Sequence, residues 1–471
     1  EPPERSAVKL QAEESAEVRL IEITDVNDDG EGVGRIDGKA VFVPGTVPGD
    51  VARVIVTQER PRFSRARVVE LAQASADRCA PPCPVFGECG GCALQHWTYA
   101  AQLEWKRRRV QEILRRVGHL DVEVRQTIGA SNPWAYRNKS QFPVGREASG
   151  EVALGLYRRG SHALVPIERC LIQDPRLDAA LAAVGSVLRT HRVRPYDEAR
   201  HAGFLRHVIL RASRCEDAVM VVLVTREEAW PGREGVIRDL AAAVPRLKSV
   251  FQNVNPERGN AILGERTLHL WGAPHLVEAV CGVRYLISPR SFFQVNPEQA
   301  EALCRTVVRQ ASAGPHELIL DLYCGTGMLS LALAKAARAV HGVEVVADAV
   351  RDARANARLN GLQNVQFHVG RAERLIPQWV GEGNGPWRGR PDVIVLDPPR
   401  AGCEPALLEA IASAAPRAVV YASCRPATLA RDLARLAERG YEVVEVQPID
   451  MFPQTPHVEC VARLKRRAAH G

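Results

Sequence analysis

The chain has 471 residues, which is too long for one hydrophobic core. Because a domain usually has about 100–200 residues, we expect about three domains. Its hydrophobic fraction of 46% and charged fraction of 25% are those of an ordinary globular protein, and no apolar run long enough for a membrane span occurs. Twelve cysteines in so long a chain, together with a glutamate-rich beginning, favour a reducing cytoplasm over a disulfide scaffold. We assume a monomer.

The net charge of +7 is a mild excess, but the basic residues are concentrated at residues 60–67, 106–116 and 158–159. The phosphates of a nucleic acid attract such clusters. Any single cluster is equally consistent with a solvated helix face. The three clusters together favour a polyanionic partner.

Residues 1–16 are polar, and we expect a disordered tail there. Residues 17–73 alternate short β-branched runs with glycine turns, a pattern that predicts about five strands in a small barrel that binds nucleic acid. The glycine-containing segments 32–35 and 43–50 resemble those of a TRAM domain, an RNA-binding barrel. An SH3-like or OB-like barrel is the alternative.

A cysteine-rich segment follows the barrel, in a Pro/Gly-rich stretch with little core to bury thiols. The spacing Cys89-x2-Cys92 lets two thiolates reach one metal, and Cys83 can add a third. Cys170 is the candidate for the fourth ligand, whereas we expect Cys79 to be a bystander. Spacing alone leaves zinc and an iron–sulfur cluster equally open.

The remaining chain predicts two further domains. A basic helix is expected near residues 103–117, and residues 134 to about 280 indicate mixed α and β structure. From residue 318 strands alternate with helices, which predicts an open α/β sheet. The division we predict is a tail 1–16, a barrel 17–73, a central domain 74–100 with 134–285, and a catalytic domain 101–133 with 286–471.

The first βα unit of the catalytic domain contains the glycine turn Cys324-Gly325-Thr326-Gly327. The second strand ends in Glu344, a spacing that suits an acid on ribose hydroxyls. A dinucleotide fold would place a third glycine where Ser330 lies. The turn instead resembles motif I of the S-adenosylmethionine (SAM) methyltransferases.

Cys424 follows a short apolar strand and precedes a helix predicted to start near Ala427. Side chains just past the carboxyl ends of parallel strands line the ligand crevice of an open sheet. A lone cysteine is nevertheless more often a small buried hydrophobe than a nucleophile. Its position alone therefore leaves both interpretations open.

Five segments together resemble the RNA uracil-5 methyltransferase family, and the resemblance extends over nearly the whole chain. Taken with the TRAM-like barrel and the cysteines, it is closest to the iron–sulfur members that modify 23S ribosomal RNA. The five segments are 288–296, 321–327, Asp397-Pro398-Pro399-Arg400, Ser423-Cys424-Arg425-Pro426, and 450–459.

The resemblance implies a Rossmann-like SAM-dependent methyltransferase domain and a covalent mechanism. Cys424 would add to C6 of uracil, and Glu459 would act as the base. The implied SAM contacts are Gln294, Tyr323, Glu344 and Asp397. The implied ligands of a 4Fe-4S cluster are Cys83, Cys89, Cys92 and Cys170.

Alternative explanations exist for individual residues and for the function, and three residues depart from the family pattern. An edge-strand position would explain Glu459, and packing against a helix would explain Tyr323. The departures are Met328, Arg371 and Arg425, where family members often have Asn. The same chemistry on the T-loop of transfer RNA, a cytosine-5 methyltransferase and a non-catalytic RNA-binding assembly factor are the competing functions.

Overall fold

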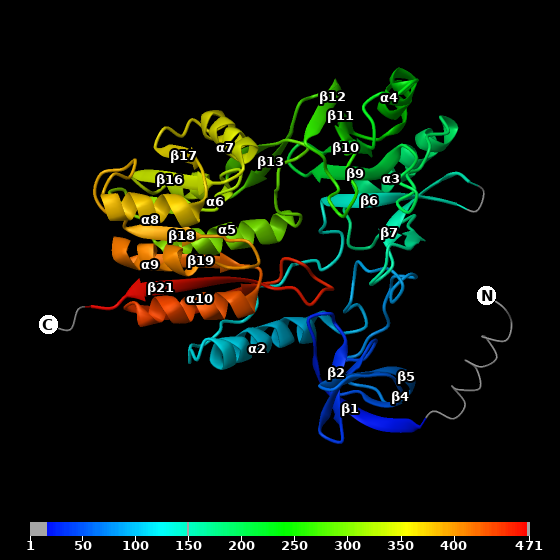
Figure 1. Ribbon diagram of the computed structural model, residues 1–471, viewed down its shortest axis with the longest axis horizontal. Helices are drawn as coiled ribbons and strands as arrows, with labels where there is room; N and C mark the ends of the chain where they lie inside the picture. Colours follow the sequence, from blue (N-terminus) through cyan, green and yellow to red (C-terminus); the bar gives the residue numbers. More distant parts are fainter. Residues whose placement is uncertain (1–16, 148–149, 469–471) are drawn as a thin grey trace. The chain divides into compact units, whose positions relative to one another are not determined.

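The computed structural model describes residues 17–147 and 150–468, and the predicted tail 1–16 lies outside this range (Figure 1). The chain divides into two compact units. The first contains the residues up to 104 together with 158–161 and 454–457, and the second contains the rest. In the described part of the chain, no helix is both long and apolar enough to cross a membrane.

The first unit contains a closed five-stranded barrel, as the sequence predicts, with strand order β1-β2-β3-β5-β4. Its core consists of inward-facing residues such as Ile21, Val43 and Val54. Buried Asp50 accepts hydrogen bonds from the guanidinium of Arg78 (2.5 and 3.1 Å), which ties the barrel to the cysteine segment. The strands are β1 (Val18–Val26), β2 (Gly32–Ile36), β3 (Lys39–Val43), β4 (Val51–Glu59) and β5 (Phe63–Gln73).

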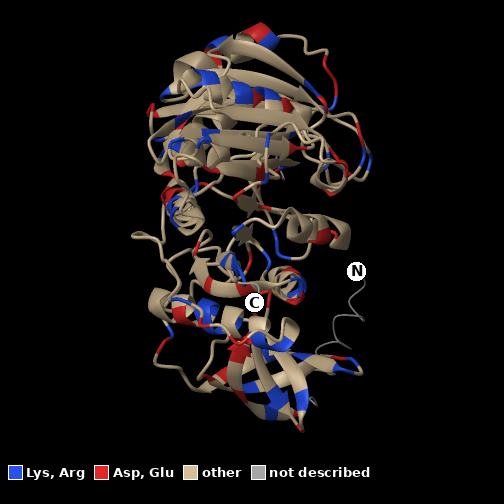
Figure 2. Ribbon diagram, turned by 90° about the vertical axis from the view of Figure 1, so that its left-hand side faces the viewer, with Lys and Arg blue, Asp and Glu red and all other residues tan. Residues whose placement is uncertain are grey.

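Lys and Arg residues are distributed over the barrel strands (Figure 2). Of the predicted basic cluster at 60–67, Arg60, Arg62 and Arg67 are exposed and Arg65 is half-buried. Arg65 lies over the ring of Phe42, with its guanidinium carbon 6.0 Å from the ring centroid. Because Arg65 also pairs with Glu31, only the exposed Arg60, Arg62 and Arg67 of this cluster are open to an anionic partner.

In the second unit, one seven-stranded sheet has the order β12-β11-β10-β9-β6-β7-β8. Only β10 and β11 pair in parallel; the other neighbours are antiparallel. Helices α3 (Pro175–Thr190) and α4 (Arg233–Ala243) contribute to the same core as the sheet. The strands are β6 (Lys139–Arg146), β7 (Val152–Tyr157), β8 (Leu164–Pro166), β9 (Leu205–Ser213), β10 (Ala218–Thr225), β11 (Leu247–Val254) and β12 (Arg266–Gly272).

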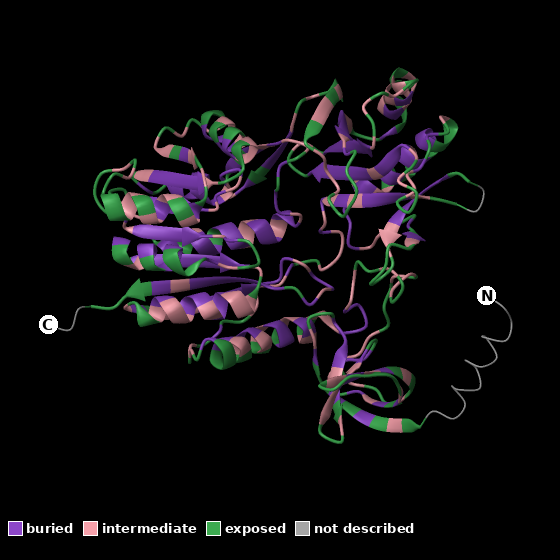
Figure 3. Cartoon of the chain, in the orientation of Figure 1, coloured by how far each residue is buried: buried purple, intermediate pink, exposed green. Residues whose placement is uncertain are grey.

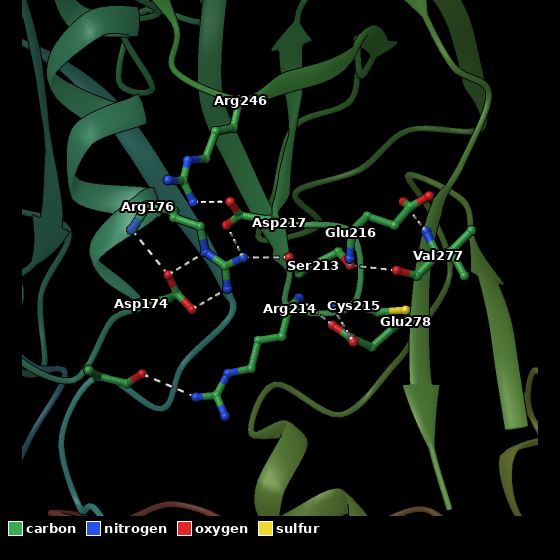
Figure 4. A network of polar contacts seen from close by, with 11 residues as sticks. Asp174, Arg176, Ser213, Arg214, Cys215, Glu216, Asp217, Arg246, Val277 and Glu278 are labelled. Carbon is green, nitrogen blue, oxygen red and sulfur yellow. Dashed lines mark hydrogen bonds and ion pairs between the residues drawn. The ribbon is translucent and has the colours of Figure 1, made fainter. Parts of the chain in front are cut away.

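A polar network links this sheet to the hairpin β13 (Leu276–Val280) and β14 (Val283–Ile287) (Figure 4). Asp174 caps α3 and pairs with Arg176, which also reaches Asp217 in the β9–β10 turn. Buried Glu278 of β13 accepts the backbone N–H groups of Arg214 (3.0 Å) and Cys215 (3.2 Å) in the same turn. The network therefore orients the hairpin that precedes the catalytic sheet.

The catalytic sheet has the order β17-β16-β15-β18-β19-β21-β20. Its first five strands are parallel, whereas β21 is antiparallel to both β19 and β20. The strands are β15 (Leu318–Leu322), β16 (Ala339–Glu344), β17 (Val365–Val369), β18 (Val393–Leu396), β19 (Ala418–Ser423), β20 (Tyr441–Ile449) and β21 (Glu459–Arg466).

Helices cover both faces of this sheet, and its central strands β15, β18 and β19 are fully buried (Figure 3). Alternate strand residues point to opposite faces. Ile319 packs in the core formed with α5 (Pro297–Ala311), α6 (Met328–Ala334) and α7 (Ala347–Leu359), whereas Leu320 packs in the other core. That second core includes residues of α2 (Tyr99–Val117), α8 (Ala372–Glu382), α9 (Pro405–Ala414) and α10 (Pro426–Glu438).

Two sequence-based expectations require correction. The helix after the glycine turn, expected over residues 329–339, ends at Ala334, and the Asn364 side chain donates to the carbonyls of Ala334 (2.8 Å) and Ala337 (2.9 Å) beyond its last turn. Lys106, which we grouped with the RNA-facing basic residues, is fully buried in an ion pair with Asp450. On the same helix Arg108, Arg115 and Arg116 are exposed.

Candidate active site

Cys424 lies in the turn between β19 and the N-terminus of α10. The Ser423 hydroxyl accepts the backbone N–H of Arg425 (3.1 Å) and closes this turn. Pro426 then starts the helix with a backbone angle suited to its first position. The half-buried thiol consequently lies at the carboxyl end of β19 and beside the N-terminus of α10, whose positive dipole end favours a thiolate and so acts against the effect of burial.

Glu459 is the first residue of β21 and is only 7% exposed. Ser423 and Cys460 are the last paired residues of the antiparallel strands β19 and β21, so Cys424 and Glu459 are the next residues beyond that pair. Their charges interact. The interpretation of Glu459 as an ordinary edge-strand residue is wrong, because β21 lies between β19 and β20. This antiparallel insertion is what places a carboxylate beside the thiol.

Asp397 and Arg400 come from the loop that follows β18. The Asp397 N–H donates to the carbonyl of Leu322 (3.2 Å), which fixes the start of the loop. The Thr428 hydroxyl of α10 donates to the carbonyl of Arg400 (3.2 Å). The Arg400 side chain comes close enough to Cys424 for its positive charge to lower the pKa of the thiol.

Burial and mutual repulsion set the proton affinities of these groups. Burial raises the pKa of Asp397 to about 7. Burial, together with the charge of Asp397, raises the pKa of Glu459 to about 8. Burial and the charge of Glu459 raise the pKa of the Cys424 thiol, and Arg400 opposes that rise. The site thus combines a strong carboxylate base with a thiol whose ionised form is stabilised by one arginine.

The glycine turn lies at the end of the neighbouring strand β15. Gly325 and Gly327 have φ angles of 54° and 86°, which L side chains rarely adopt. A Cβ on Gly325 would meet no atom within 4 Å, so a ligand can approach the backbone there. Glu344, at the end of β16, accepts the N–H groups of Gly325 (3.1 Å) and Val346 (2.8 Å).

Asp321, inside β15, is completely buried, and burial raises the pKa of its carboxyl to about 7. One oxygen accepts the Ser330 hydroxyl (2.5 Å), whereas the other has no protein partner among the described residues. The unpaired oxygen of Asp321 is an acceptor that suits the polar end of an amino-acid-like ligand. The residues around the turn therefore fit SAM.

Two predicted SAM contacts are placed less directly. Tyr323 follows β15 with φ of 67°, and its hydroxyl donates to Glu373 of α8 (2.8 Å), which fixes the ring. Gln294, only 9% exposed, lies in the loop before α5. The SAM roles of both residues stay predictions.

Three of the predicted metal ligands lie in the first unit. The charges of Cys83 and Cys89 interact, and the Cys89 sulfur accepts the N–H of Gly91 (3.4 Å). Cys170 belongs to the second unit, where its N–H donates to Asp178 (3.1 Å). Within residues 17–147 and 150–468, no group of three or more His, Cys, Asp or Glu side chains is arranged to hold a metal ion, so the ligand set stays a prediction.

Sequence reasoning assigned no role to Arg400 or Asp321. Both residues lie in segments that carry the family resemblance. The signal that could have identified Arg400 is its position as a cation directly after the Asp-Pro-Pro turn. The contact between Arg400 and Cys424 joins loops after two different strands, however, and only the folded sheet creates it.

A glycine turn with a carboxylate at the end of the second strand is the arrangement of a SAM-dependent methyltransferase site, and here a thiol beside a buried carboxylate lies at the same end of the sheet. A family model described as tRNA (Uracil-5-)-methyltransferase matches residues 279–467, and the TRAM domain model matches residues 13–69.

Similar proteins extend this result over nearly the whole chain. An uncharacterized RNA methyltransferase of Halalkalibacterium halodurans is 45% identical over 449 residues, which are 95% of this chain and 97% of that protein. One from Listeria monocytogenes is 44% identical over 442 residues, 94% of this chain and 96% of that protein.

Among solved structures, the tRNA (uracil-54, C5)-methyltransferase of Pyrococcus abyssi, in complex with S-adenosyl-L-homocysteine, superposes with a TM-score of 0.74. It is 30% identical, and the match covers 95% of this chain and 100% of that one. The chain therefore belongs to the RNA uracil-5 methyltransferases, which are SAM-dependent enzymes.

Proposed function

We propose that this enzyme methylates C5 of a uracil in 23S ribosomal RNA, with Cys424 as nucleophile and Glu459 as base. The observation that supports the chemistry is the grouping of Cys424, Glu459, Asp397 and Arg400 at the ends of adjacent strands. Ribosomal RNA is inferred from the resemblance of the barrel and the cysteine set to iron–sulfur members of the family.

Uracil C5 is too weak a nucleophile to take a methyl group unaided. The Cys424 thiolate forms a bond to C6, and the ring electrons move to give an enolate that is nucleophilic at C5. C5 then bonds to the methyl carbon of the sulfonium that SAM would supply, and the bond between that carbon and sulfur breaks to leave S-adenosylhomocysteine. Glu459 then takes the proton from C5, and the bond between Cys424 and C6 breaks, which releases the thiolate.

The surroundings of Cys424 and Glu459 suit these two steps. The positive charge of Arg400 favours the thiolate both when it attacks and when it leaves. A pKa of about 8 makes Glu459 a stronger base than an exposed carboxylate. The target base must leave its stack to reach the thiol, and the exposed arginines of the barrel are suited to hold the flanking phosphates.

The substrate is tested by incubating the protein with labelled SAM and, separately, with bulk ribosomal RNA and transfer RNA, followed by digestion to nucleosides. We expect label in 5-methyluridine from ribosomal RNA. Label from transfer RNA alone would retain the chemistry but contradict the proposed substrate.

The second candidate function is the same methylation on transfer RNA. It rests on one observation: the similar Pyrococcus abyssi enzyme is a tRNA (uracil-54, C5)-methyltransferase.

Glu459→Gln is expected to trap a covalent protein–RNA adduct. Addition survives because glutamine removes a negative charge that raises the pKa of Cys424, whereas elimination stops for lack of a base. A band of RNA-linked protein on a denaturing gel measures this outcome. The double variant Glu459→Gln with Cys424→Ala is the control and should give no band; absence of a band from the single variant would count against Glu459 as the base.

The single-turnover methylation rate is expected to rise between about pH 6.5 and pH 9. The deprotonated form of Glu459 increases as pH passes its pKa of about 8, and the thiolate form of Cys424 increases in the same direction. Adduct formation by Glu459→Gln should depend on the thiol alone and follow a different profile. A wild-type rate that falls over this range would contradict the assignment.

We further propose that Cys83, Cys89, Cys92 and Cys170 hold a 4Fe-4S cluster. Two interacting thiols and a backbone N–H directed at one sulfur match the chemistry of such a group. Because no redox step is needed for methyl transfer, we assign the cluster a structural role.

Anaerobically purified protein should be brown and contain about four irons per chain. Cys89→Ser should lose most of the iron, whereas Cys79→Ser, as a matched control in the same segment, should retain it. Colourless protein with one zinc per chain would refute the cluster.

A further inference from the structure

The sheet β12-β11-β10-β9-β6-β7-β8 contains a cavity of about 260 Å³ that the methylation chemistry does not use. None of its lining residues belongs to the site around Cys424. Its polar and aromatic lining comes from β7, β9 and the loops beside them: Tyr157, His162, Tyr196, Glu198, Arg206 and His207.

Aromatic rings in the cavity are held in fixed orientations. Tyr157 stacks on His162, with ring centroids 4.9 Å apart and planes inclined by 17°. The Arg206 guanidinium lies over Tyr196, 4.7 Å from the ring centroid, and the Tyr196 hydroxyl is 2.7 Å from Nδ1 of His201. Flat surfaces of this kind accept another flat ring.

The polar groups offer both acceptors and donors. Nδ1 of His162 lies within hydrogen-bond distance (2.8 Å) of the Glu198 carboxylate and so fixes its position. Arg206 is 4% exposed; its Nη1 donates to the carbonyls of Asn255 (2.7 Å) and Glu257 (2.5 Å), while its Nε has no protein partner among the described residues. Nδ1 of His207 also has none.

This lining discriminates between ligand classes. A phosphate is disfavoured because Glu198 would repel it, and an apolar ligand would leave the polar atoms unpaired. The volume lies just below the roughly 300–1,000 Å³ of typical ligand sites, so it suits one small ring system. Burial and the charge of Arg206 lower the pKa of His207 to about 4, so its imidazole is neutral and can donate or accept.

We propose that this cavity binds a second unpaired nucleobase of the RNA substrate. The base stacks on the faces of Tyr157 and Tyr196 that His162 and Arg206 leave uncovered, and its exocyclic amino group donates to Glu198. The proposal rests on the enzyme's action on RNA. Extruding a target uracil unstacks its neighbours, and a pocket for one of them stabilises the opened RNA. The amino group distinguishes this base from the uracil bound at Cys424.

Short unstructured oligoribonucleotides, with a central uracil flanked by adenines, by cytosines or by uracils, test the proposal in fluorescence-anisotropy titrations of the full-length protein. We expect the adenine- and cytosine-flanked probes to bind more tightly than the all-uracil probe. Tyr157→Ala should weaken their binding about five- to a hundredfold, because stacking on one aromatic ring is lost. Tyr157→Phe, which keeps the ring, should bind within about twofold of wild type, which excludes general misfolding.

Glu198→Gln should reduce the preference for amino-bearing flanks while leaving binding of the all-uracil probe unchanged. Equal affinity of the wild type for all three probes, or wild-type affinity in Tyr157→Ala, would overturn the proposal. Because these titrations measure binding, they are independent of the methylation assay. A protein that shows this pattern but leaves ribosomal RNA unmethylated would contradict the proposed substrate and not the nucleobase pocket.

Discussion

Cys424→Ala is expected to abolish methyl transfer, with a loss of at least about 10³-fold in rate, because no other group can form the bond to C6. RNA binding should stay within about tenfold of wild type, since most of the affinity comes from phosphate contacts. Labelled 5-methyluridine measures the first quantity, and a filter-binding titration measures the second.

Two further thiol variants sharpen this test. Cys215→Ala removes an exposed cysteine in the β9–β10 turn of the second unit and should leave the rate unchanged. Cys424→Ser keeps the size of the side chain but replaces the thiol by a much weaker nucleophile, so it should be as inactive as the alanine variant. Full activity in Cys424→Ala would refute the covalent mechanism.

Lys106→Met is expected to destabilise the protein by about 3–5 kcal/mol. The Nζ atom of Lys106 lies 2.5 Å from Oδ1 of Asp450, and both side chains are 0% exposed. Burial lowers the pKa of Lys106, and the charge of Asp450 opposes that shift. Without the lysine, Asp450 is left as an uncompensated buried charge. The midpoint and slope of a urea unfolding curve measure the loss.

Two control variants separate the buried ion pair from general damage to α2. Arg115→Met alters an exposed residue of the same helix and should change stability by no more than about 0.5 kcal/mol. Replacing both partners, in Lys106→Met with Asp450→Leu, should recover much of the loss because no unpaired charge remains. A cost below about 1 kcal/mol for the single variant would contradict the role assigned to this pair.

The effect of Lys106→Met also bears on the active site, because Asp450 lies at the end of β20, just before the segment that leads to Glu459. Carbonyls in this segment are held by buried polar side chains: Asn296 donates to Met451 (3.2 Å) and Tyr136 to Pro453 (3.1 Å). Loosening it should therefore slow methylation in molecules that remain folded.

Much of this architecture could be predicted from the sequence, because local patterns determine it. Period-two alternation in a glycine-punctuated segment predicted the barrel, and strand–turn–helix repeats predicted the parallel strands that end at Asp397 and Cys424. These signals depend on neighbours in the chain, so no tertiary information is needed to recognise them.

The sequence by itself determined the class of enzyme, through motifs whose residue types are dictated by the chemistry of SAM and of a thiol nucleophile. Only the tertiary structure decided which charges meet. It buried Lys106, inserted β21 between β19 and β20, and brought Arg400 to the thiol. Burial and proton affinity depend on atoms from distant segments that approach one another only when the sheets form, and a linear pattern holds no record of those approaches.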